Sequence, residues 1–467
     1  MPDKPNVLLL FTDDQRFDTI AALGNEHIST PNMDRLVRRG VAFTHAHIPC
    51  GTSPAVCMPS RAMLHTGRTL FHIEGAGETI SPDHVMLGEH FRRHGYRTFG
   101  TGKWRNGTES YARSFTDGAE IYFGGMADHW NVPTSDFDPT GEYDNSKPIC
   151  GNWYLSNEVH LQHCDHIRPG VHSSELLADA AIDFLRGYDG DDPFLMYVSF
   201  LAPHDPRIMP QEFLDMYDPA DVVLPANFMP AHPFDNGELH MRDEMLAASP
   251  RTEHGIRRHI AEYYAMISHL DFEIGRVLDE LDARGLTDDT IIVFAGDNGL
   301  AVGQHGLMGK QSCYEHSVRV PLIFAGPHLP AGRTRDAYAY LLDIFPTLCD
   351  LCSLPVPSSV EGASLVGALH DDDEKVRDTI FAAYLGMHRM VKDRRHKLIE
   401  YVVDGAHAQT QLFDLQADPW ELTNLADSPA HWDILTRLRV TLTIWRDNWD
   451  DQATDWGQQF WSAYSAE

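Results

Sequence analysis

Residues 54–68, PAVCMPSRAMLHTGR, bring a thiol, a rigid turn and a cation into one short motif. Cys57 lies two residues before Pro59 and four before Arg61. Neither a disulfide nor a zinc site requires that spacing. A cysteine can act as a nucleophile when a neighbouring cation lowers the pKa of its thiol. A thiol protease would also need a histidine base and an oxyanion hole, and the nearby residues indicate neither.

A second chemical signal lies at the ends of two predicted strands, residues 6–12 and 290–296. The polar residues that follow these strands are Asp13, Asp14, Asp297 and Asn298. In open α/β sheets, ligands bind beyond the carboxyl ends of the strands, and adjacent carboxylates repel each other unless a cation neutralises them. On its own, either pair is better explained as turn or helix-cap residues than as metal ligands. Two pairs at matching strand ends indicate an all-oxygen site for Ca²⁺ or Mg²⁺.

Strand-like and helix-like segments alternate along most of the chain. Short apolar runs bounded by Asp, Gly or Pro are typical of buried strands in a parallel sheet. We expect such strands at residues 6–12, 193–200, 290–296 and 320–326. Helical periodicity predicts helices at residues 31–39, 84–94, 174–186 and 255–284. This alternation predicts an α/β sheet that is covered by helices on both faces.

The pattern changes after about residue 370. We therefore expect an α/β catalytic domain over residues 1–370 and a smaller α+β domain over residues 371–467. The smaller domain contains two predicted strands, at residues 380–386 and 397–403, and two predicted helix starts, at Asp418-Pro419 with Glu421 and at Ser428-Pro429. The segment from about 107 to 170 has little periodicity and is expected to be a substrate-facing insertion.

Composition excludes several classes of partner. The formal net charge of −31 argues against nucleic acid, which needs a basic surface. No segment reaches the length of a bilayer-spanning apolar run, and the first residues lack an export signal, so we expect a cytoplasmic protein without membrane contact. The seven cysteines are an odd number scattered along the chain, which favours reduced thiols.

C-x-P-x-R is the motif by which sulfatases have a cysteine oxidised to formylglycine, and Cys57, Pro59 and Arg61 match it. Further family motifs follow in the expected order. They are LLLFTDDQR (8–16), TGR (66–68), GKW (102–104), PH (203–204), DNG (297–299), GKQSCYEHSVRVPLI (309–323) and LFDLQADPWELTNLA (412–426). On these residues the chain resembles the type I, formylglycine-dependent sulfatases of the alkaline phosphatase superfamily over nearly its whole length.

The resemblance implies a fold and a cofactor set. The fold is a large mixed, mostly parallel sheet sandwiched by helices, with a smaller C-terminal α+β domain. Ca²⁺, with Mg²⁺ as the alternative, is bound in the family by residues that match Asp13, Asp14, Asp297 and Asn298. Cys57 would be converted to formylglycine by a formylglycine-generating enzyme or an anaerobic sulfatase-maturing enzyme, and the aldehyde hydrate would be the nucleophile.

The resemblance also implies catalytic roles for cationic residues. Arg61, Lys103 and Lys310 would stabilise the negative charge of the sulfate group in the transition state. His204 would contact the sulfate and, with Lys310, protonate the leaving alcohol. The chain has few lysines, and two of them fall within these motifs. That placement supports the assignment.

One position departs from the family pattern. Most members carry a histidine two residues after the GKW lysine, where this chain has Arg105. Arginine has no accessible neutral form and cannot act as the base of the elimination step. Arg105 is then a substrate contact, or another group replaces the histidine. By sequence neighbourhood alone, His72, His129 and His305 are candidates, and each reads more readily as a structural or substrate-binding residue.

The predicted function is hydrolysis of a sulfate monoester, either a sulfated sugar or a small alkyl or aryl sulfate. A phosphonate monoester or phosphodiester hydrolase is the alternative enzyme, because it shares the fold, the metal set and the formylglycine. A degenerate sulfatase that only binds sulfated ligands is a second alternative, suggested by Arg105. The presence of the other motif residues argues against it.

Overall fold

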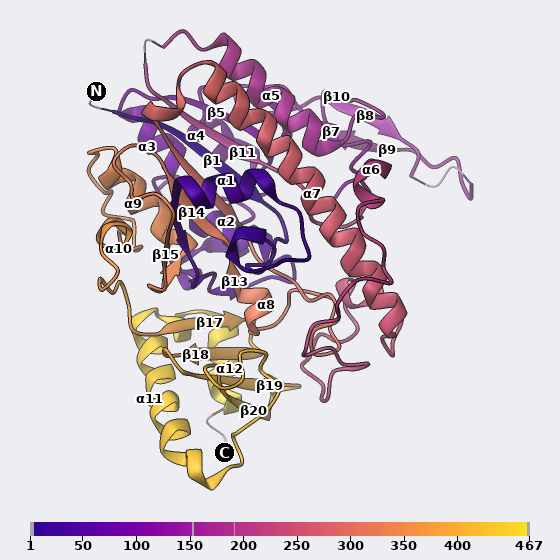
Figure 1. Ribbon diagram of the computed structural model, residues 1–467, viewed down its shortest axis with the longest axis vertical. Helices are drawn as coiled ribbons and strands as arrows, with labels where there is room; N and C mark the ends of the chain where they lie inside the picture. Colours follow the sequence, from indigo (N-terminus) through magenta and orange to yellow (C-terminus); the bar gives the residue numbers. More distant parts are fainter. Residues whose placement is uncertain (1–3, 152–153, 191, 465–467) are drawn as a thin grey trace.

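The computed structural model describes residues 4–151, 154–190 and 192–464 (Figure 1). Its centre is an eight-stranded sheet. In spatial order the strands are β15 (Arg333–Arg335), β2 (Gly40–Phe43), β14 (Leu322–Ala325), β12 (Thr290–Gly296), β1 (Asn6–Thr12), β11 (Phe194–Ser199), β5 (Arg97–Lys103) and β6 (Asp117–Tyr122). Within this sheet five neighbouring pairs are parallel and two, both involving β14, are antiparallel. The expected mixed, mostly parallel sheet is confirmed.

The period-two alternation of β1 divides the apolar interior into two cores. Val7, Leu9 and Phe11 belong to one core, and Leu8 and Leu10 to the other. The first core is covered by α2 (Cys57–Thr66), α3 (Leu87–Arg93), α4 (Thr108–Ser114) and α9 (Ile344–Leu351). The second is covered by α1 (Pro31–Arg39), α5 (Ser173–Gly187) and α7 (Glu253–Ala283), and α5 and α7 run side by side in Figure 1. The sheet is therefore a buried layer between two layers of helices.

The strands and helices expected from strong apolar patterns are present. β1, β12 and α1 have the expected bounds, and the ends of the others are shifted. Three expectations need correction, two of them in the catalytic part and one in the C-terminal part. The strand expected at residues 320–326 is β14, which is antiparallel to β12 rather than part of the parallel set. The segment 107–170 is not a featureless insertion, because it includes α4 and β6. It also carries two small antiparallel pairs, β7 (Pro133–Thr134) with β10 (His166–Ile167) and β8 (Ser146–Ile149) with β9 (His160–His163).

The C-terminal part forms a second sheet of five strands below the first in Figure 1. In spatial order they are β20 (Ala406–Asp414), β19 (His396–Val403), β18 (His388–Lys392), β17 (Ile380–Tyr384) and β4 (Cys50–Gly51). The edge strand β4 comes from the N-terminal part and pairs in parallel with β17. The two parts of the chain are thus joined by a shared sheet, six residues before the C-x-P-x-R motif begins.

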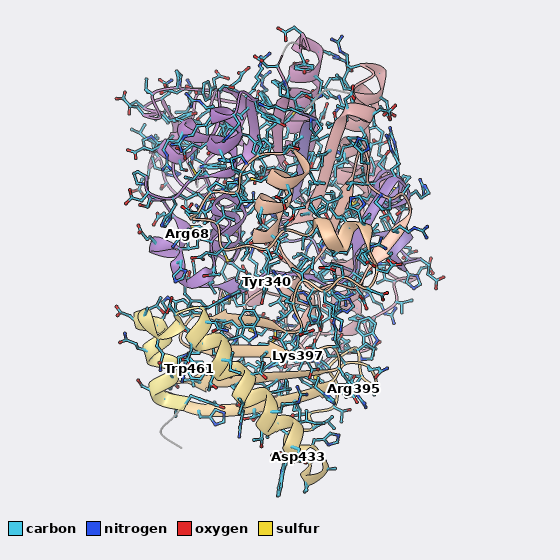
Figure 2. The ribbon with its side chains drawn as sticks, turned by 90° about the vertical axis from the view of Figure 1, so that its left-hand side faces the viewer. Arg68, Tyr340, Arg395, Lys397, Asp433 and Trp461 are labelled. Atoms are coloured by element: carbon cyan, nitrogen blue, oxygen red, sulfur yellow. The ribbon has the colours of Figure 1, made fainter. Side chains whose placement is uncertain are left out.

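Two helices, α11 (Trp432–Asn448) and α12 (Asp455–Tyr464), pack on this second sheet. Figure 2 shows Trp461 on α12 and Lys397 on β19. Trp461 donates from Nε1 to Asp451 Oδ2 at 2.7 Å, and Asp451 also accepts from Arg389 Nη2 of β18 at 2.8 Å. A buried ion pair therefore anchors the last helix to the sheet.

The helix expected to start at Asp418 is absent, although the one expected after Ser428 is present as α11. Asp418 Oδ2 instead accepts from the backbone of Leu422 and Thr423, both at 2.7 Å, which closes a turn. Glu421 has a positive φ of 58° and is buried, where it pairs with Lys397 at 2.7 Å. Its carboxylate is used in the interior and cannot close a capping box.

The remaining short elements connect these layers. They are β3 (Ala46–His47), β13 (Arg319–Val320), β16 (Ala339–Tyr340), α6 (Gln211–Leu214), α8 (Glu315–Val318) and α10 (Val366–His370). No helix in the described ranges is both long and apolar enough to cross a bilayer. All seven cysteines are free thiols, as the odd count predicts.

Candidate active site

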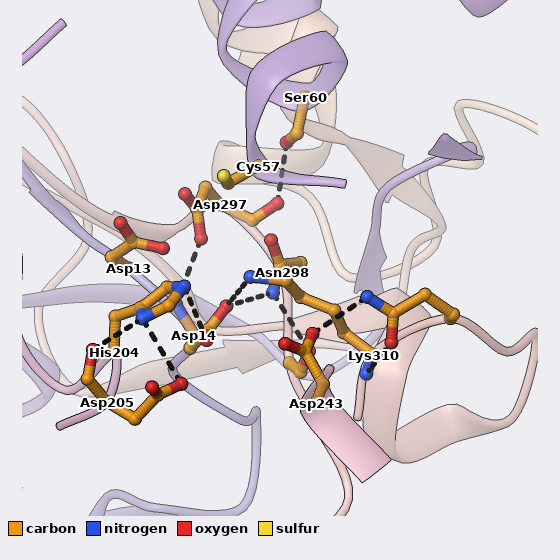
Figure 3. A network of polar contacts seen from close by, with 12 residues as sticks. Asp13, Asp14, Cys57, Ser60, His204, Asp205, Asp243, Asp297, Asn298 and Lys310 are labelled. Carbon is orange, nitrogen blue, oxygen red and sulfur yellow. Dashed lines mark hydrogen bonds and ion pairs between the residues drawn. The ribbon is translucent and has the colours of Figure 1, made fainter. Parts of the chain in front are cut away.

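Two pairs of polar residues meet at the carboxyl edge of the central sheet. β1 and β12 are parallel neighbours with Thr12 opposite Gly296, so the residues that follow both strands leave the sheet at the same edge. The backbone N–H of Asp14 donates to Asp297 Oδ1 at 3.0 Å, and Asn298 Nδ2 donates to Asp14 Oδ1 at 2.7 Å (Figure 3). The four residues predicted as metal ligands are therefore brought together.

Three permanent cations surround these carboxylates. Lys103, at the end of β5, pairs with Asp13 Oδ2, and Lys310 Nζ lies 2.6 Å from Asp14 Oδ1. Arg61 donates from Nε to Asp297 Oδ2 at 3.0 Å, and its Nη2 lies 3.5 Å from Asp13 Oδ2. All of these side chains are buried. Three negative and three positive charges thus meet inside the protein, and we call this set, with Cys57, Asn298 and His204, the catalytic cluster.

Arg61 also fixes the helix that carries the cysteine. Its Nη1 donates to the Lys103 carbonyl at 3.2 Å and to Ser199 Oγ at 2.5 Å, and its guanidinium carbon lies 5.1 Å from the centre of the Phe11 ring. These contacts join α2 to β5, β11 and β1. Any displacement of α2 would break hydrogen bonds to two strands and the cation–π contact to a third, so the first turn of this helix is held firmly over the sheet edge.

Cys57 is the first residue of α2 and points into the cluster (Figure 3). Its Sγ lies 3.6 Å from Lys103 Nζ, and the residue is 3% exposed. Burial raises the pKa of the Cys57 thiol, although Lys103 and Lys310 oppose that shift. A protonated thiol is a poor nucleophile, so the geometry does not favour a thiol hydrolase.

His204 follows β11 and faces the cluster from the side of Asp14. Its Nε2 lies 3.5 Å from Asp14 Oδ2, and its Nδ1 lies 2.9 Å from the carbonyl oxygen of Asp205. His129 lies behind it, with Nε2 3.0 Å from the His204 carbonyl and Nδ1 2.7 Å from Ser173 Oγ. Burial lowers the pKa of His129 to about 4. His129 therefore supports the His204 backbone as a neutral ring, and both of its nitrogens are engaged.

The structure does not bring His72 or His305 into the cluster. His72 contacts Glu361 Oε1 at 2.6 Å and Asp450 Oδ2 at 3.2 Å, so it joins the catalytic part to the C-terminal part. His305 stacks on Tyr314 with ring centres 4.0 Å apart, and its Nε2 lies 3.1 Å from Asn227 Nδ2. Burial lowers the pKa of His305 to about 3. Both residues have structural contacts that account for them.

Arg105 follows Lys103 by two residues and lies against Gly125. A Cβ atom on Gly125 would stand 3.3 Å from the guanidinium carbon of Arg105, so glycine leaves the room that this side chain occupies. Its Nε is buried and has no hydrogen-bond partner within the described ranges.

Sequence reasoning missed an acidic group beside the cluster. Arg242 Nη1 lies 2.8 Å from Asp205 Oδ1 and 3.1 Å from Asp243 Oδ1. Burial alone would raise the pKa of Asp243. The charge of Lys310 and the hydrogen bonds that Asp243 accepts from Gln311 and Arg242 hold this pKa below its usual value. Asp205 directly follows the PH motif, and this position could have indicated from the sequence that Asp205 lies near the site. Nothing in the sequence around Asp243 marks it, because it reaches the site through a long irregular segment.

The cluster fits a hard divalent cation. Asp13 Oδ1 and Asn298 Oδ1 are buried and lack a hydrogen-bond partner among the residues described, so two oxygens remain for a ligand. Ligand atoms of Asp13, Asp14 and His204 all lie within 4.8 Å of one another, as do those of Asp13, Cys57 and Asp297. Burial raises the pKa of Asp297 to about 7, and the neighbouring Asp13 adds to the shift. A cation among these oxygens would relieve that repulsion.

Comparison with known proteins agrees with this geometry. Residues 5–354 match the family model described as Sulfatase, and residues 303–448 match the model described as N-sulphoglucosamine sulphohydrolase, C-terminal. An arylsulfatase of Clostridium perfringens is 28% identical over 469 residues, covering 94% of each chain. A choline-sulfatase of Rhizobium meliloti is 30% identical over 479 residues, covering 97% of this chain and 88% of the relative.

Two solved structures share the fold. A protein in complex with its substrate D-glucosamine-2-N,6-O-disulfate superposes with a TM-score of 0.74 at 23% identity, covering 97% of this chain and 99% of that chain. A phosphonate monoester hydrolase of Agrobacterium radiobacter superposes with a TM-score of 0.75 at 24% identity, covering 96% of both chains. The alkaline phosphatase-like fold is thereby confirmed. On the family match and the length over which relatives align, the chain belongs to the sulfatase family of the alkaline phosphatase superfamily and is a sulfatase-type hydrolase.

Proposed function

We propose that this enzyme hydrolyses a sulfate monoester with a nucleophile derived from Cys57, which is oxidised to formylglycine. The observation that carries the proposal is the position of Cys57 on the first turn of α2, with its Sγ 3.6 Å from Lys103 Nζ and grouped with the carboxylates of Asp13 and Asp297. Burial raises the pKa of its thiol, and the C-x-P-x-R motif around it supports a role as the precursor of formylglycine. When modified, it would supply a hydrated aldehyde whose hydroxyl attacks sulfur and whose second hydroxyl later expels sulfate.

We assign the metal to Asp13, Asp14, Asp297 and Asn298, with Ca²⁺ favoured because the donor set is all oxygen. A bound divalent cation would supply positive charge to a sulfate oxygen. The three carboxylates and three cations of the catalytic cluster cancel in the absence of a metal ion. A bound divalent cation would therefore give the cluster a net positive charge. This charge balance supports an anionic substrate.

The protein's own cations would hold the sulfate group. Lys103 and Lys310 are paired with Asp13 and Asp14, and both are buried away from competing water. Their ammonium groups need no rearrangement when negative charge moves toward the leaving oxygen. Arg61 bridges the carboxylates of Asp297 and Asp13 and so ties the first turn of α2 to them.

His204 is the proton-transfer residue in this proposal. Because Nδ1 contacts the Asp205 carbonyl, Nε2 is the nitrogen that faces the reacting groups. As an imidazolium it would donate a proton to the leaving oxygen, and as the neutral ring it would accept one in the elimination step. Arg105 cannot replace it as a base, and both nitrogens of His129 are engaged.

The substrate class that we propose is a sulfated sugar or another small sulfate ester. Support comes from relatives named as arylsulfatase and choline-sulfatase, and from the fold neighbour solved with a disulfated glucosamine. The fold neighbour that is a phosphonate monoester hydrolase favours a second candidate function at the same site. Both reactions would use the same nucleophile and cations, so kinetics must separate them.

The test combines mass spectrometry and kinetics on one preparation from the native host. Trypsin releases residues 40–61 as one peptide that contains Cys57. We expect a peptide lighter by the difference between a thiol and an aldehyde, with the change at Cys57. We also expect higher kcat/KM on 4-nitrophenyl sulfate and on glucosamine sulfates than on phenyl phosphonate esters. An unmodified thiol in active enzyme would refute the nucleophile, and the reverse preference would assign the second function.

A further inference from the structure

Two groups of the proposed reaction, the proton-transfer residue His204 and the sulfate-binding Lys310, lie outside helices and strands. His204 is in the turn after β11, and Lys310 is in the loop between β12 and α8. Such segments lack the regular backbone hydrogen bonds that hold a helix or a strand, so other contacts must fix where these two side chains lie. One short segment, residues 242–244, supplies contacts to both.

The first contact reaches His204 through Asp205. His204 Nδ1 lies 2.9 Å from the Asp205 carbonyl oxygen and 3.4 Å from Asp205 Oδ1. Arg242 donates from Nη1 to Asp205 Oδ1 at 2.8 Å and pairs through Nη2 with Oδ2. Two parallel contacts of this kind fix the plane of a carboxylate. Burial alone would raise the pKa of Asp205, but the hydrogen bonds from Arg242 and the charge of His204 lower it to about 2, so the residue stays ionised.

The second contact reaches the Lys310 loop through Asp243. Arg242 Nη1 also donates to Asp243 Oδ1 at 3.1 Å, and Asp243 Oδ2 accepts from Gln311 Nε2 at 2.8 Å. Gln311 Oε1 in turn accepts from the backbone N–H of Lys310 at 2.9 Å. Figure 3 shows Asp205 with His204 and Asp243 with Lys310 in one polar network. A single guanidinium therefore joins the two segments that carry the active groups.

The neighbouring Glu244 holds the same loop by its backbone. Its carboxylate accepts from the N–H groups of Met308 and Gly309, both at 2.9 Å, and from Arg251 Nη2 at 2.6 Å. A Cβ atom on Gly309 would stand 2.4 Å from Gln311 Oε1, so glycine permits this close approach. The loop before Lys310 is thus fixed to residues 242–244 by side chains and by packing.

Arg242 is exposed although the groups that it joins are not. Its side chain is 43% exposed, whereas the side chains of Asp205 and Asp243 are 8% and 15% exposed. Ion pairs made by an exposed arginine contribute little to stability. Its contacts to two nearly buried carboxylates, one linked to each active group, favour a role in their placement.

We propose that Arg242 is a positioning residue, which places His204 through Asp205 and Lys310 through Asp243 and Gln311. The inference rests on the proposed hydrolysis. When the bond between sulfur and the leaving oxygen breaks, its electron pair moves to that oxygen, and a proton passes to the oxygen from His204 Nε2. Placement of His204 and Lys310 therefore matters most for esters of basic alcohols, including the sugar and alkyl sulfates of the proposed substrate class.

The test is the leaving-group dependence of kcat/KM, which reports the step that breaks the S–O bond. The substrates are 4-nitrophenyl, phenyl and 4-methoxyphenyl sulfate, of which the last two release more basic phenols. In Arg242→Met we expect kcat/KM to fall about 10²-fold on those two esters and no more than about threefold on 4-nitrophenyl sulfate. The reason is that 4-nitrophenolate leaves without a proton donor, whereas a basic phenolate needs one.

Two variants serve as controls. Arg258→Met removes a comparable ion pair, because Arg258 is 69% exposed and lies 2.8 Å from Glu262, and it should leave kcat/KM unchanged on all three esters. Arg242→Lys keeps a cation beside the carboxylates and should recover at least about tenfold of the loss. It also provides the test if Arg242→Met does not fold. An equal loss on all three esters, as a substrate contact would give, overturns the proposal, and so does an unchanged kcat/KM on all of them.

Ring-nitrogen NMR of protein with isotope-labelled histidine measures the placement of His204 without turnover, and His204→Gln identifies its signals. They should shift in Arg242→Met and stay in place in Arg258→Met. Asp243→Ala breaks only the link to Lys310, so it should show the same leaving-group trend without this shift. Unchanged His204 signals in Arg242→Met would overturn the proposal. A wild type that turns over none of the esters would refute the proposed hydrolysis, and the NMR comparison would still decide whether Arg242 positions His204.

Discussion

Two clusters of buried charge among the described residues differ in how completely they pair. In the first, which we call the junction network, Glu315 of α8 contacts Lys392 Nζ at 2.8 Å and Lys397 Nζ at 3.1 Å, and Glu421 contacts Lys397 at 2.7 Å. Two carboxylates meet two lysines, and all four side chains are buried. Figure 2 shows Lys397 on the second sheet, so the network attaches that sheet to the catalytic part.

The catalytic cluster is also balanced in charge, yet it is not closed. Asp13 Oδ1 and Asn298 Oδ1 have no hydrogen-bond partner in the described ranges, and the buried Cys57 thiol accepts a long hydrogen bond from Lys103 Nζ at 3.6 Å. A buried network in which every charge is paired mainly stabilises one arrangement of the fold. A buried network with unpartnered ligand atoms can bind a metal ion or a substrate. The comparison predicts that mutations in the two clusters will have separable effects on turnover and on stability.

The largest expected effect is the loss of turnover in Cys57→Ala. Without the precursor of the nucleophile, kcat/KM for 4-nitrophenyl sulfate should fall roughly 10⁴-fold or more. Stability should hardly change, because the thiol is small and Lys103 keeps its pairing with Asp13. Steady-state kinetics and thermal unfolding on the same preparation measure both. Cys50→Ala is the matched control, since Cys50 is buried in the same tryptic peptide but lies in β4, and it should retain turnover.

The next largest effect is a loss of stability in Lys397→Met. Removing this lysine leaves Glu421 and part of Glu315 unpaired in the interior, so the free energy of unfolding should fall by about 3–5 kcal/mol. Urea unfolding gives that value, and kcat/KM per folded molecule should match the wild type. Lys375→Met, at an exposed position, controls for the loss of charge. A variant that lost turnover while staying fully folded would contradict the separation of the two clusters.

A smaller effect is expected from the metal. Ca²⁺ that binds only the folded protein should stabilise it by about 2.7 kcal/mol when the free ion is at about 100 times Kd. Calorimetric unfolding with Ca²⁺ and with a chelator measures the shift in Tm. The shift should disappear in Asp297→Asn and persist in Lys397→Met. Equal shifts in both variants would place the ion elsewhere.

The last effect concerns pH and His232, whose ring centre lies 6.0 Å from that of Tyr314, the residue before Glu315. Burial lowers the pKa of His232 to about 4, whereas an unfolded histidine titrates near about 6.5. Between these values the unfolded state binds more protons than the native state, so the free energy of unfolding falls as the pH falls. In His232→Gln this slope should be shallower by at most about 1.4 kcal/mol per pH unit. Urea unfolding between pH 4 and 7 tests it, and identical slopes would refute the assignment.

Much of the site follows from local sequence. β1 and β12 were predicted as continuous apolar runs, and their confirmed parallel pairing puts Asp13 and Asp297 at one edge of the sheet. Other elements were not predictable in this way. β4 has only two residues, and its partner β17 lies more than 300 residues later, so no local periodicity marks it. The helix expected at Asp418 failed because Glu421 is drawn into the interior by Lys397.

The sequence by itself determined the chemical groups of the active site and the order in which the chain delivers them. Only particular residue types can serve as the precursor of the nucleophile, as oxygen ligands of a hard cation, or as cations. Short sequence motifs contain these residues. Only the tertiary structure decided which groups meet. Asp205, Arg242 and Asp243 reach the cluster, whereas His72 and His305 do not. Contacts across such distances depend on strand order and on how irregular segments pack, and neither leaves a local pattern in the sequence.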